Sequence, residues 1–283
     1  MDISVITPFY KGNSYMEGLF GCVRACAAAA PRLSVELVLV NDSPDCAVEY
    51  DPKWVQGFTL NLVTNSQNSG IHRSRVNGLS AARGLFIQFL DQDDLLEPQT
   101  FVSQFALTKS ADVVVANGID QNPNSCGPIY KSADHQAQAV HSRFYYSVGN
   151  QIVSPGHTLI RKEAIPQAWM ESFISRNGSD DLLLWLMMFA QGARFVQNPE
   201  ILYTHVDTGA NVSANIDKML ASSQEVLTLL EKEHMITPKQ AKKFRRSRAM
   251  ARYYVGKSKL QKIFAMVRFP DVAWEKICLQ RYK

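Results

Sequence analysis

The fold of this chain is decided by the stretch Leu85-Phe86-Ile87-Gln88-Phe89-Leu90-Asp91-Gln92-Asp93-Asp94. Its first six residues are mostly apolar and have the length of a strand, which predicts a buried strand. Three aspartates follow within four positions. Ligands of open α/β sheets bind just beyond the carboxyl ends of the strands, so we expect these aspartates to line a binding crevice.

Aspartates this close together repel one another unless a cation lies among them. Hard oxygen ligands suit Mg²⁺ or Mn²⁺, which commonly bridge one or two carboxylates to a diphosphate. The alternative is a polar turn after a strand, in which Asp93 or Asp94 caps the next helix. The residues alone leave both interpretations open, and for Asp94 we favour the cap.

The composition is that of an ordinary globular protein. The chain has 283 residues, of which 46% are hydrophobic, which suits one large α/β domain with an appendage or two small domains. No apolar stretch reaches the ~18–20 residues of a membrane span, and the sequence opens on a strand pattern, so we expect no signal peptide. Five cysteines without CxxC spacing favour reduced, cytosolic thiols over a disulfide framework or a zinc site.

Charge is distributed unevenly along the chain. Residues 239–283 contain 14 Lys and Arg against 2 Asp and Glu, a local net charge of +12. Because the whole chain carries +4, residues 1–238 carry −8. Such a division bears on the choice of partner and not on the fold.

Strand and helix patterns alternate through most of the chain, which predicts a mostly parallel α/β sheet with right-handed crossovers. We expect strands at 2–7, 35–40, 59–64, 85–90, 112–116, 152–162, 194–196 and 201–203. Helices are expected at 13–30, 72–82, 180–191 and from about 215 to the end, with breaks before Pro238 and Pro270. The weakly patterned residues 120–150 are interpreted as a long connection.

Other polar side chains follow the predicted strands or begin the predicted helices. Asp42 can accept hydrogen bonds from a base or a ribose, and its alternative role is an Asx turn. The turn at Gly70, followed by Arg73 and Arg75 at a helix start, favours an anionic ligand, although a solvated first helical turn has the same composition. The acidic pair Asp180-Asp181 starts another helix, where it serves as cap and dipole partner, or one of the two carboxylates acts as a general base.

Taken in chain order, these segments resemble the motifs of family 2 glycosyltransferases with the GT-A fold. The resemblance covers about residues 2–213, and its matching segments are 3–11, 40–45, 68–78, 82–94, 180–185 and 203–213. Residues 82–94 are similar to the block Ala-x-Gly-x-Tyr-Ile-x-Phe-Leu-Asp-x-Asp-Asp, and residues 203–213 resemble the closing strand through Tyr203, His205, Asn211 and Ser213.

Some positions depart from the family pattern. Asn41 replaces the first acid of the Asp-Asp turn, so that Asp42 has to contact the base alone, and Val76 replaces an asparagine. Asp180 replaces a glutamate, whereas Asp181 keeps the position of the family's base. The Gln-x-x-Arg-Trp motif of processive members is absent, which implies a non-processive enzyme.

The resemblance implies a GT-A (Rossmann-like) catalytic domain at 1–213, with a mixed, mostly parallel sheet, and a basic helical extension at 214–283. It implies that a nucleotide-sugar donor is bound by Pro8, Phe9, Tyr10, Asp42, Gly70, Arg75, Asp91 and Gln92. Among these, Asp91 contacts the ribose and Arg75 the diphosphate. Mn²⁺ or Mg²⁺ is assigned to Asp93 and His205, although a histidine after a strand is also a common structural residue. Asp181 is assigned as the base of an inverting displacement.

The extension interleaves basic and aromatic residues, which suits the anionic inner face of a plasma membrane and a lipid-diphosphate-linked glycan acceptor. The alternative is a solvated helical hairpin packed on the core, and its exposed aromatics also allow a homo-oligomer. No nucleic-acid motif accompanies the charge, so nucleic acid is not an expected partner.

Our main hypothesis is a metal-dependent, inverting hexosyl- or N-acetylhexosaminyltransferase that uses a UDP-sugar in surface polysaccharide (O-antigen or capsule) biosynthesis. A cytoplasmic location at the membrane follows from that hypothesis. One rival is a nucleotidyltransferase, for which the turn at residues 8–13 is poor in glycine. The other is a non-catalytic membrane-associated binding module.

Overall fold

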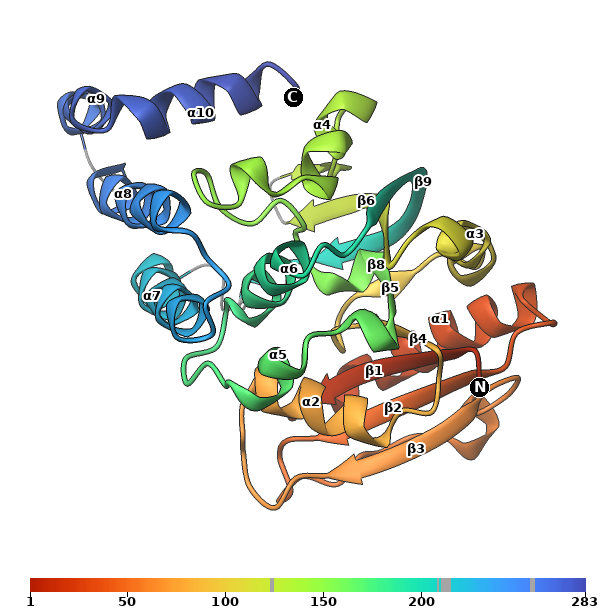
Figure 1. The fold of residues 1–283 in the computed structure, drawn as a ribbon. Helices are drawn as coiled ribbons and strands as arrows, with labels where there is room; N and C mark the ends of the chain where they lie inside the picture. Colours follow the sequence, from red (N-terminus) through yellow and green to blue (C-terminus); the bar gives the residue numbers. More distant parts are fainter. Residues whose placement is uncertain (123–124, 208, 210–214, 255–257) are drawn as a thin grey trace.

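The computed structural model describes residues 1–283 except 123–124, 208, 210–214 and 255–257. Within the described residues, nine strands form one mixed sheet in the order β3-β2-β1-β4-β8-β6-β9-β5, and β7 pairs with β6 (Figure 1). The strands are β1 (Ile3–Phe9), β2 (Val35–Asn41), β3 (Thr59–Thr64), β4 (Phe86–Phe89), β5 (Leu95–Leu96), β6 (Val113–Asn122), β7 (Ser125–Pro128), β8 (Thr158–Arg161) and β9 (Phe195–Val206).

The first half of the sheet is parallel, as the alternating pattern predicts. β1 pairs in parallel with β2 and β4, and β2 pairs with β3. β8 then runs antiparallel between β4 and β6, whereas β6 and β9 are parallel. In this register Phe9 lies opposite Asn41 and Ile6 lies opposite Phe89, so the carboxyl ends of β1, β2 and β4 meet at one edge.

Helices bury both faces of the sheet, because the strands are apolar on both sides. Val5 packs in a cluster with residues of α1 (Met16–Ala29) and α3 (Thr100–Leu107). The next residue, Ile6, points to the opposite face and packs with residues of α2, α5, α6 and α7. These helices are α2 (Ile71–Ala81), α5 (Gln167–Glu171), α6 (Asp180–Ala190) and α7 (Ile216–Lys232).

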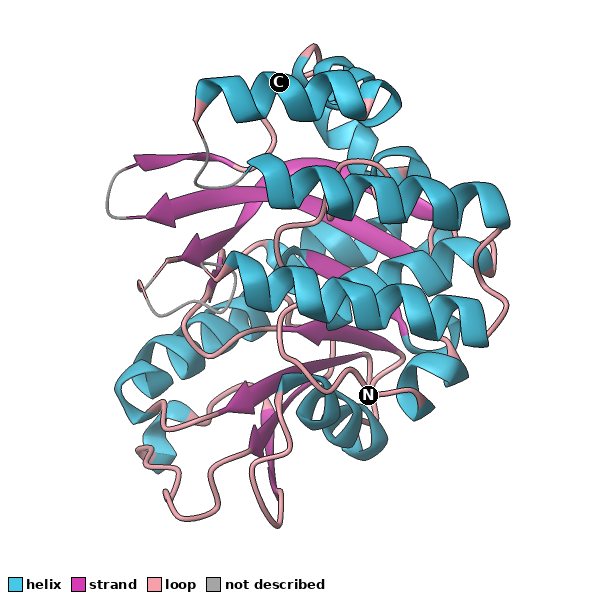
Figure 2. Ribbon diagram, turned by 90° about the vertical axis from the view of Figure 1, so that its left-hand side faces the viewer, coloured by secondary structure: helices cyan, strands magenta, loops and turns pink. Residues whose placement is uncertain are grey.

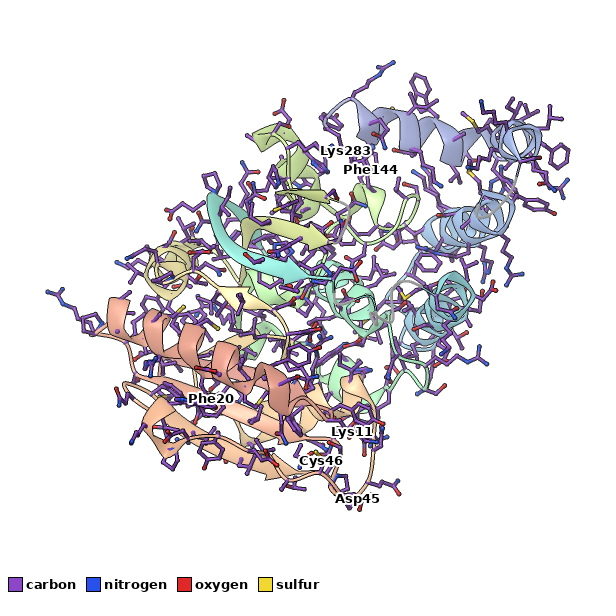
Figure 3. All side chains as sticks on the ribbon, turned by 180° about the vertical axis from the view of Figure 1, so that it is seen from behind. Lys11, Phe20, Asp45, Cys46, Phe144 and Lys283 are labelled. Carbon is purple, nitrogen blue, oxygen red and sulfur yellow. The ribbon has the colours of Figure 1, made fainter. Side chains whose placement is uncertain are left out.

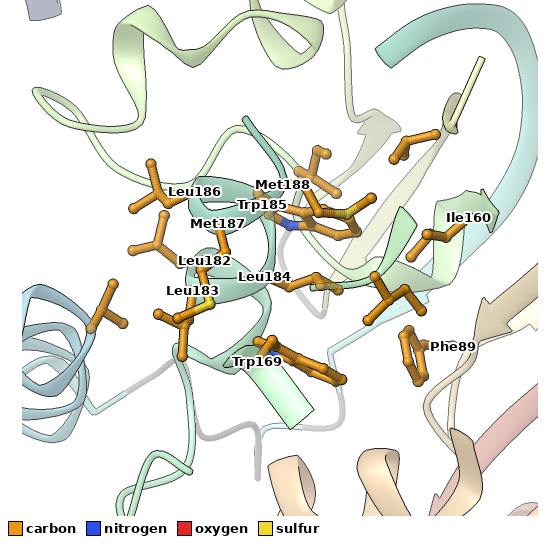
Figure 4. Packing of buried hydrophobic residues seen from close by; sticks show 14 of the residues in the cluster. Phe89, Ile160, Trp169, Leu182, Leu183, Leu184, Trp185, Leu186, Met187 and Met188 are labelled. Atoms are coloured by element: carbon orange, nitrogen blue, oxygen red, sulfur yellow. The ribbon is translucent and has the colours of Figure 1, made fainter. Parts of the chain in front are cut away.

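Helix α6 lies inside the protein, with apolar side chains on every side. Residues 182–188 are all buried, and Figure 4 shows Leu184 on the side of Phe89 while Leu183 lies on the other side of the helix. A helix that is apolar all round has to be covered all round, and this requirement fixes its position. The acidic start of α6 is thereby fixed beside the sheet edge.

The C-terminal helices form a stack beside the sheet (Figures 1 and 2). They are α7, α8 (Pro238–Tyr254), α9 (Lys259–Arg268) and α10 (Pro270–Gln280), and α10 ends near α4 (Ala133–Ala137). Phe244 of α8 belongs to the same core cluster as α6 and α7, whereas α9 and α10 form a small separate cluster around Met250. The division of the chain after residue 213 stays a prediction. Among the described helices, none combines the length and the apolar character that crossing a membrane requires.

Three features of the fold differ from the sequence prediction. The two short strands expected at 194–203 are one strand, β9, with Pro199 and Glu200 in a bulge where the missing proline N–H does no harm. Residues 120–150 are not a plain connection, because they contain β7 and α4. Strand β5 was also not predicted, since two residues are too short to show a period.

Candidate active site

The predicted site residues meet at the carboxyl ends of β1, β2 and β4. Asp42 follows β2, Asp91 follows β4, and the N–H of Asp42 donates to the Phe9 carbonyl at 2.8 Å. Strand pairing alone therefore brings the three loops together at the edge where α/β sheets bind ligands.

The turn after β1 is held by Gln92. The Tyr10 N–H donates to Gln92 Oε1 at 3.0 Å, and Gln92 Nε2 donates to the Tyr10 carbonyl at 3.3 Å. Tyr10 is half exposed and Pro8 is partly exposed, so both are accessible to a ligand. The Phe9 side chain is fully buried in the cluster with α1 and faces away from the crevice, so its role in base binding stays a prediction that the position of its side chain does not support.

Asp42 holds the loop that leads into α2. Its Oδ1 accepts from Asn65 Nδ2 and the Ser69 N–H, both at 2.7 Å, and its Oδ2 accepts from the Gly70 N–H at 2.9 Å. Gly70 has φ +82°, a conformation that glycine adopts without strain. The buried carboxylate thus positions the loop, and its contact with a base stays a prediction.

Arg75 joins two parts of the site that are far apart in sequence. Its Nη2 lies 2.6 Å from Asp91 Oδ1 and its Nη1 lies 2.7 Å from Asp180 Oδ2. Burial lowers the pKa of Arg75, but the charges of Asp91 and Asp180 outweigh burial and raise it. The guanidinium is almost fully buried and both terminal nitrogens are ion-paired, so here Arg75 positions two carboxylates and does not face a diphosphate as the sequence predicts.

Asp181 has the environment of a general base. Its Oδ2 accepts from Asn150 Nδ2 at 2.6 Å and its Oδ1 accepts from the Leu182 N–H at 2.7 Å. Burial, followed by the charge of Asp180, raises the pKa of Asp181 to about 7. A carboxyl with a pKa near neutrality can accept a proton from a hydroxyl at physiological pH. Asp180 differs, because Arg75 outweighs the effect of burial and lowers its pKa.

A second acidic cluster lies on the other side of Asp91. Asp94 is buried, accepts from the Tyr203 hydroxyl and the Val206 N–H, and lies 3.2 Å from His205 Nδ1. The predicted capping role of Asp94 is wrong, because β5 follows it and the next helix begins only at Thr100. The hydrogen bond to Asp94 is the main reason why the pKa of His205 is raised to about 9.

The residues beside Asp94 offer part of a metal site. Among the described residues, no group of three His, Cys, Asp or Glu side chains is arranged to hold a metal. Burial, with the charges of Asp94 and Asp91, raises the pKa of Asp93 to about 6, as expected where carboxylates crowd without a cation. His205 turns Nδ1 toward Asp94, which is how metal-binding histidines are commonly oriented, with the other nitrogen as ligand. Asp93 and His205 therefore fit a divalent ion that takes its other ligands from a diphosphate and water.

Several residues that hold the site were not recognised in the sequence. Asn65 donates to Asp42 and to the Ser74 hydroxyl, and Tyr203 donates to Asp94 over 109 residues. His157 is buried in the core, where its Nδ1 lies 2.7 Å from the Ala116 carbonyl. Asn211 and Ser213 lie outside the described residues.

Comparison with known proteins agrees with this geometry. Residues 4–169 match the family described as Glycosyl transferase family 2. The chain is 36% identical to the minor teichoic acid biosynthesis protein GgaB of Bacillus subtilis over 103 residues, which are 35% of this chain and 11% of GgaB. It is 31% identical to the putative glycosyltransferase EpsH of Bacillus subtilis over 125 residues, 41% of this chain and 33% of EpsH. The chain thus spans a third or less of these relatives.

Solved structures share the fold. Residues 1–349 of S. aureus TarS superpose with a TM-score of 0.63 at 18% identity, over 96% of this chain and 81% of that one. A mannosyltransferase from Pyrobaculum calidifontis superposes with a TM-score of 0.54 at 14% identity, over 99% of this chain and 84% of that one. The predicted GT-A fold is confirmed, and the match over more than half of its length places the chain in glycosyl transferase family 2.

Proposed function

We propose that this chain transfers one hexosyl or N-acetylhexosaminyl unit from a UDP-sugar to a hydroxyl of a glycan acceptor, with inversion, during surface polysaccharide biosynthesis. The observation that carries the proposal is Asp181, a carboxyl with a pKa of about 7. Its neighbour in sequence, Asp180, is joined through Arg75 to the donor-side Asp91. The names of relatives support the pathway, since GgaB is a teichoic acid biosynthesis protein.

In the proposed reaction, Asp181 accepts the proton of the acceptor hydroxyl while the oxygen attacks the anomeric carbon of the donor. The bond from that carbon to the diphosphate breaks, and the nucleoside diphosphate leaves with the bonding electrons. Asn150 holds the Asp181 carboxylate at 2.6 Å, which keeps it in position before the acceptor arrives.

A divalent ion, Mn²⁺ or Mg²⁺, is part of the proposal, and Asp93 and His205 would hold it. When bound, such an ion neutralises the charge that develops on the leaving diphosphate. Two solved relatives of the fold support a nucleotide-sugar donor with metal. TarS has been crystallised with UDP-GlcNAc, and the Pyrobaculum enzyme with GDP-Man and Mn²⁺.

The proposed acceptor is lipid-linked, and the proposed location is the cytoplasmic face of the plasma membrane. Residues 239–283 would contact anionic lipid there, since they carry a net charge of +12. A homo-oligomer would be formed, if at all, through the same helices.

The test is calorimetric binding of UDP, GDP, CDP and dTDP to the whole chain, with and without Mn²⁺. The proposal expects UDP to bind at least tenfold more tightly with Mn²⁺ than without, and Asp93→Asn to remove that difference. Failure of all four diphosphates to bind would refute a working glycosyltransferase. Metal-independent binding would refute only the role of the ion.

A further inference from the structure

Helix α9 exposes its large apolar side chains. Leu260, Ile263, Phe264 and Val267 are each between 55% and 79% exposed. Their spacing of three, one and three residues puts them on one stripe of the helix. The opposite side of α9 contributes the small, fully buried Ala265 to the cluster with Met250. The helix therefore packs on the protein through a small residue and presents a wide apolar stripe outward, which is unusual for a solvated surface.

Several basic residues of α8, in contrast, are paired with acidic residues of the protein. Phe244 is fully buried, Arg245 pairs with Glu231, and Arg246 pairs with Asp271 through three hydrogen bonds of 2.6 to 3.1 Å. Lys243 Nζ forms an ion pair with Glu275 Oε1 at 2.6 Å. For α8 the packed alternative is therefore the better description.

Asp271 and Glu275, the two acidic residues of 239–283, are both used in these ion pairs. Helix α9 itself contains no acidic residue. Its sequence contributes Lys259, Lys262 and Arg268 beside the apolar stripe. Trp274, which is 55% exposed, and Ile277 add apolar surface on α10. A wide apolar stripe bordered by cations is complementary to an anionic lipid surface, where apolar side chains enter the acyl boundary and cations meet the head groups.

A cavity of about 350 Å³ lies beneath this surface. It is lined by Val148, Met250, Met266, Ala273 and Lys276 among others. Arg248 is not among its lining residues; its terminal nitrogens lie close to Gly149, where an added carbon would be 3.8 Å from both of them.

The guanidinium of Arg248 is buried and packs 4.5 Å from the Phe244 ring centre, and its Nε and Nη2 have no hydrogen-bond partner in the described part of the chain. A buried cation without an anion is costly. Burial, and then the charge of Arg248, lower the pKa of Lys276, which places the two cations near each other. Arg248 and Lys276 therefore add positive charge to the C-terminal helices that carry the apolar stripe.

We propose that α9 docks on an anionic phospholipid bilayer, with Leu260, Ile263, Phe264 and Val267 in the acyl boundary and the neighbouring cations at the head groups. This surface lies away from the donor loops, as Figure 3 shows for Lys283 at the opposite end from Lys11 and Asp45. The inference builds on the membrane contact of the proposed function, but it does not depend on turnover.

The test is co-sedimentation of the whole chain with vesicles of phosphatidylcholine alone and of equal parts phosphatidylcholine and phosphatidylglycerol. We expect binding to the anionic vesicles and a blue shift of the Trp274 fluorescence, which Trp274→Phe removes. The double variant Leu260→Glu, Val267→Glu should lose at least tenfold in vesicle affinity. Leu85→Glu is the matched control, since Leu85 is 60% exposed beside the N-terminus and should bind as the wild type.

The contribution of the cations is tested separately with Lys259→Gln, Arg268→Gln, which should reduce the preference for phosphatidylglycerol. An unchanged preference would overturn the role of these cations at the head groups. Failure of the wild type to bind, or equal binding by the double variant, would overturn the docking surface. If light scattering shows that the wild type is a dimer and the double variant is a monomer, the apolar stripe is an interface with a second copy of this chain instead. The double variant should bind the donor as the wild type does. Loss of vesicle binding with intact donor binding therefore separates the docking surface from the proposed function.

Discussion

Replacing Asp181 with asparagine should abolish catalysis and at the same time stabilise the protein at alkaline pH. In the folded protein the pKa of Asp181 is raised from its ordinary value of 3.8 to about 7, mainly by burial and then by Asp180. At about 1.4 kcal/mol per pKa unit, this rise means that ionisation of this side chain costs the folded state about 4 kcal/mol. Asparagine keeps the shape and the hydrogen bond from Asn150 but carries no charge.

The sign of the effect depends on pH. Below about pH 4 the carboxyl is protonated in the folded and in the unfolded chain, so wild type and Asp181→Asn should be equally stable. Between pH 4 and 7 the unfolded chain ionises first, and the wild type loses stability. At pH 8 the loss is nearly complete, and Asp181→Asn should melt about 8 °C higher at roughly 2 °C per kcal/mol for a chain of this size.

The assay combines thermal melting at pH 5 and pH 8 with release of nucleoside diphosphate from donor and acceptor. Turnover should fall by about 10³-fold, within the usual contribution of a general base. Asp180→Asn is the matched control, because Arg75 lowers the pKa of Asp180 and its carboxylate stabilises the fold. That variant should melt lower than the wild type at pH 8. If Asp181→Asn melts no higher than the wild type at pH 8, or keeps its turnover, the assignment of Asp181 as a general base with a raised pKa is refuted.

Three further predictions concern the rest of the site. Arg75→Met should lower the free energy of unfolding in urea by about 3–5 kcal/mol, because it leaves two carboxylates at the buried site without their cation; a loss below about 1 kcal/mol would contradict the positioning role. Chelation with EDTA should stop turnover and added Mn²⁺ restore it in the wild type, whereas Asp93→Asn should need a higher Mn²⁺ concentration; turnover in EDTA would argue against the metal. Gly70→Ala should cost about 1–3 kcal/mol in thermal melting, because φ is +82° and the new carbon would lie 2.9 Å from Asn177 Oδ1, while Gly21→Ala, in α1 with open space around it, should stabilise by about 0.5–1 kcal/mol.

The parallel half of the sheet was predictable from sequence because each of its strands is an apolar run followed by polar turn residues. Strands β1, β2 and β4 lie where the pattern places them, and their pairing then brings Asp42 and Asp91 to one edge. Strands β5 and β7 carry no comparable signal, since one has two residues and the other is exposed and contains glycine and proline.

The roles of individual site residues were less predictable, because they depend on partners far away in the sequence. Asp94 looks like a helix cap locally, but its hydrogen-bond partners Tyr203 and His205 lie more than 100 residues further on. Phe9 is different, because the period of two through Ile3 and Val5 already directs it into the core. Alternation along the strand therefore predicts the position of Phe9 better than the motif does.

Arg75 is paired with Asp91 on the donor side and with Asp180 beside the base Asp181. Donor binding and the protonation of Asp181 are therefore coupled. A donor that draws the Asp91 carboxylate to its ribose would weaken the hold of Asp91 on Arg75 and leave more positive charge for Asp180 and Asp181. The pKa of Asp181 would then fall, and the carboxyl would release its proton. Calorimetry of donor binding in buffers of different ionisation enthalpy would register that proton. With a pKa of about 7, the empty enzyme would carry a fraction of its base protonated at neutral pH, and the loaded enzyme would carry it ionised and ready to react.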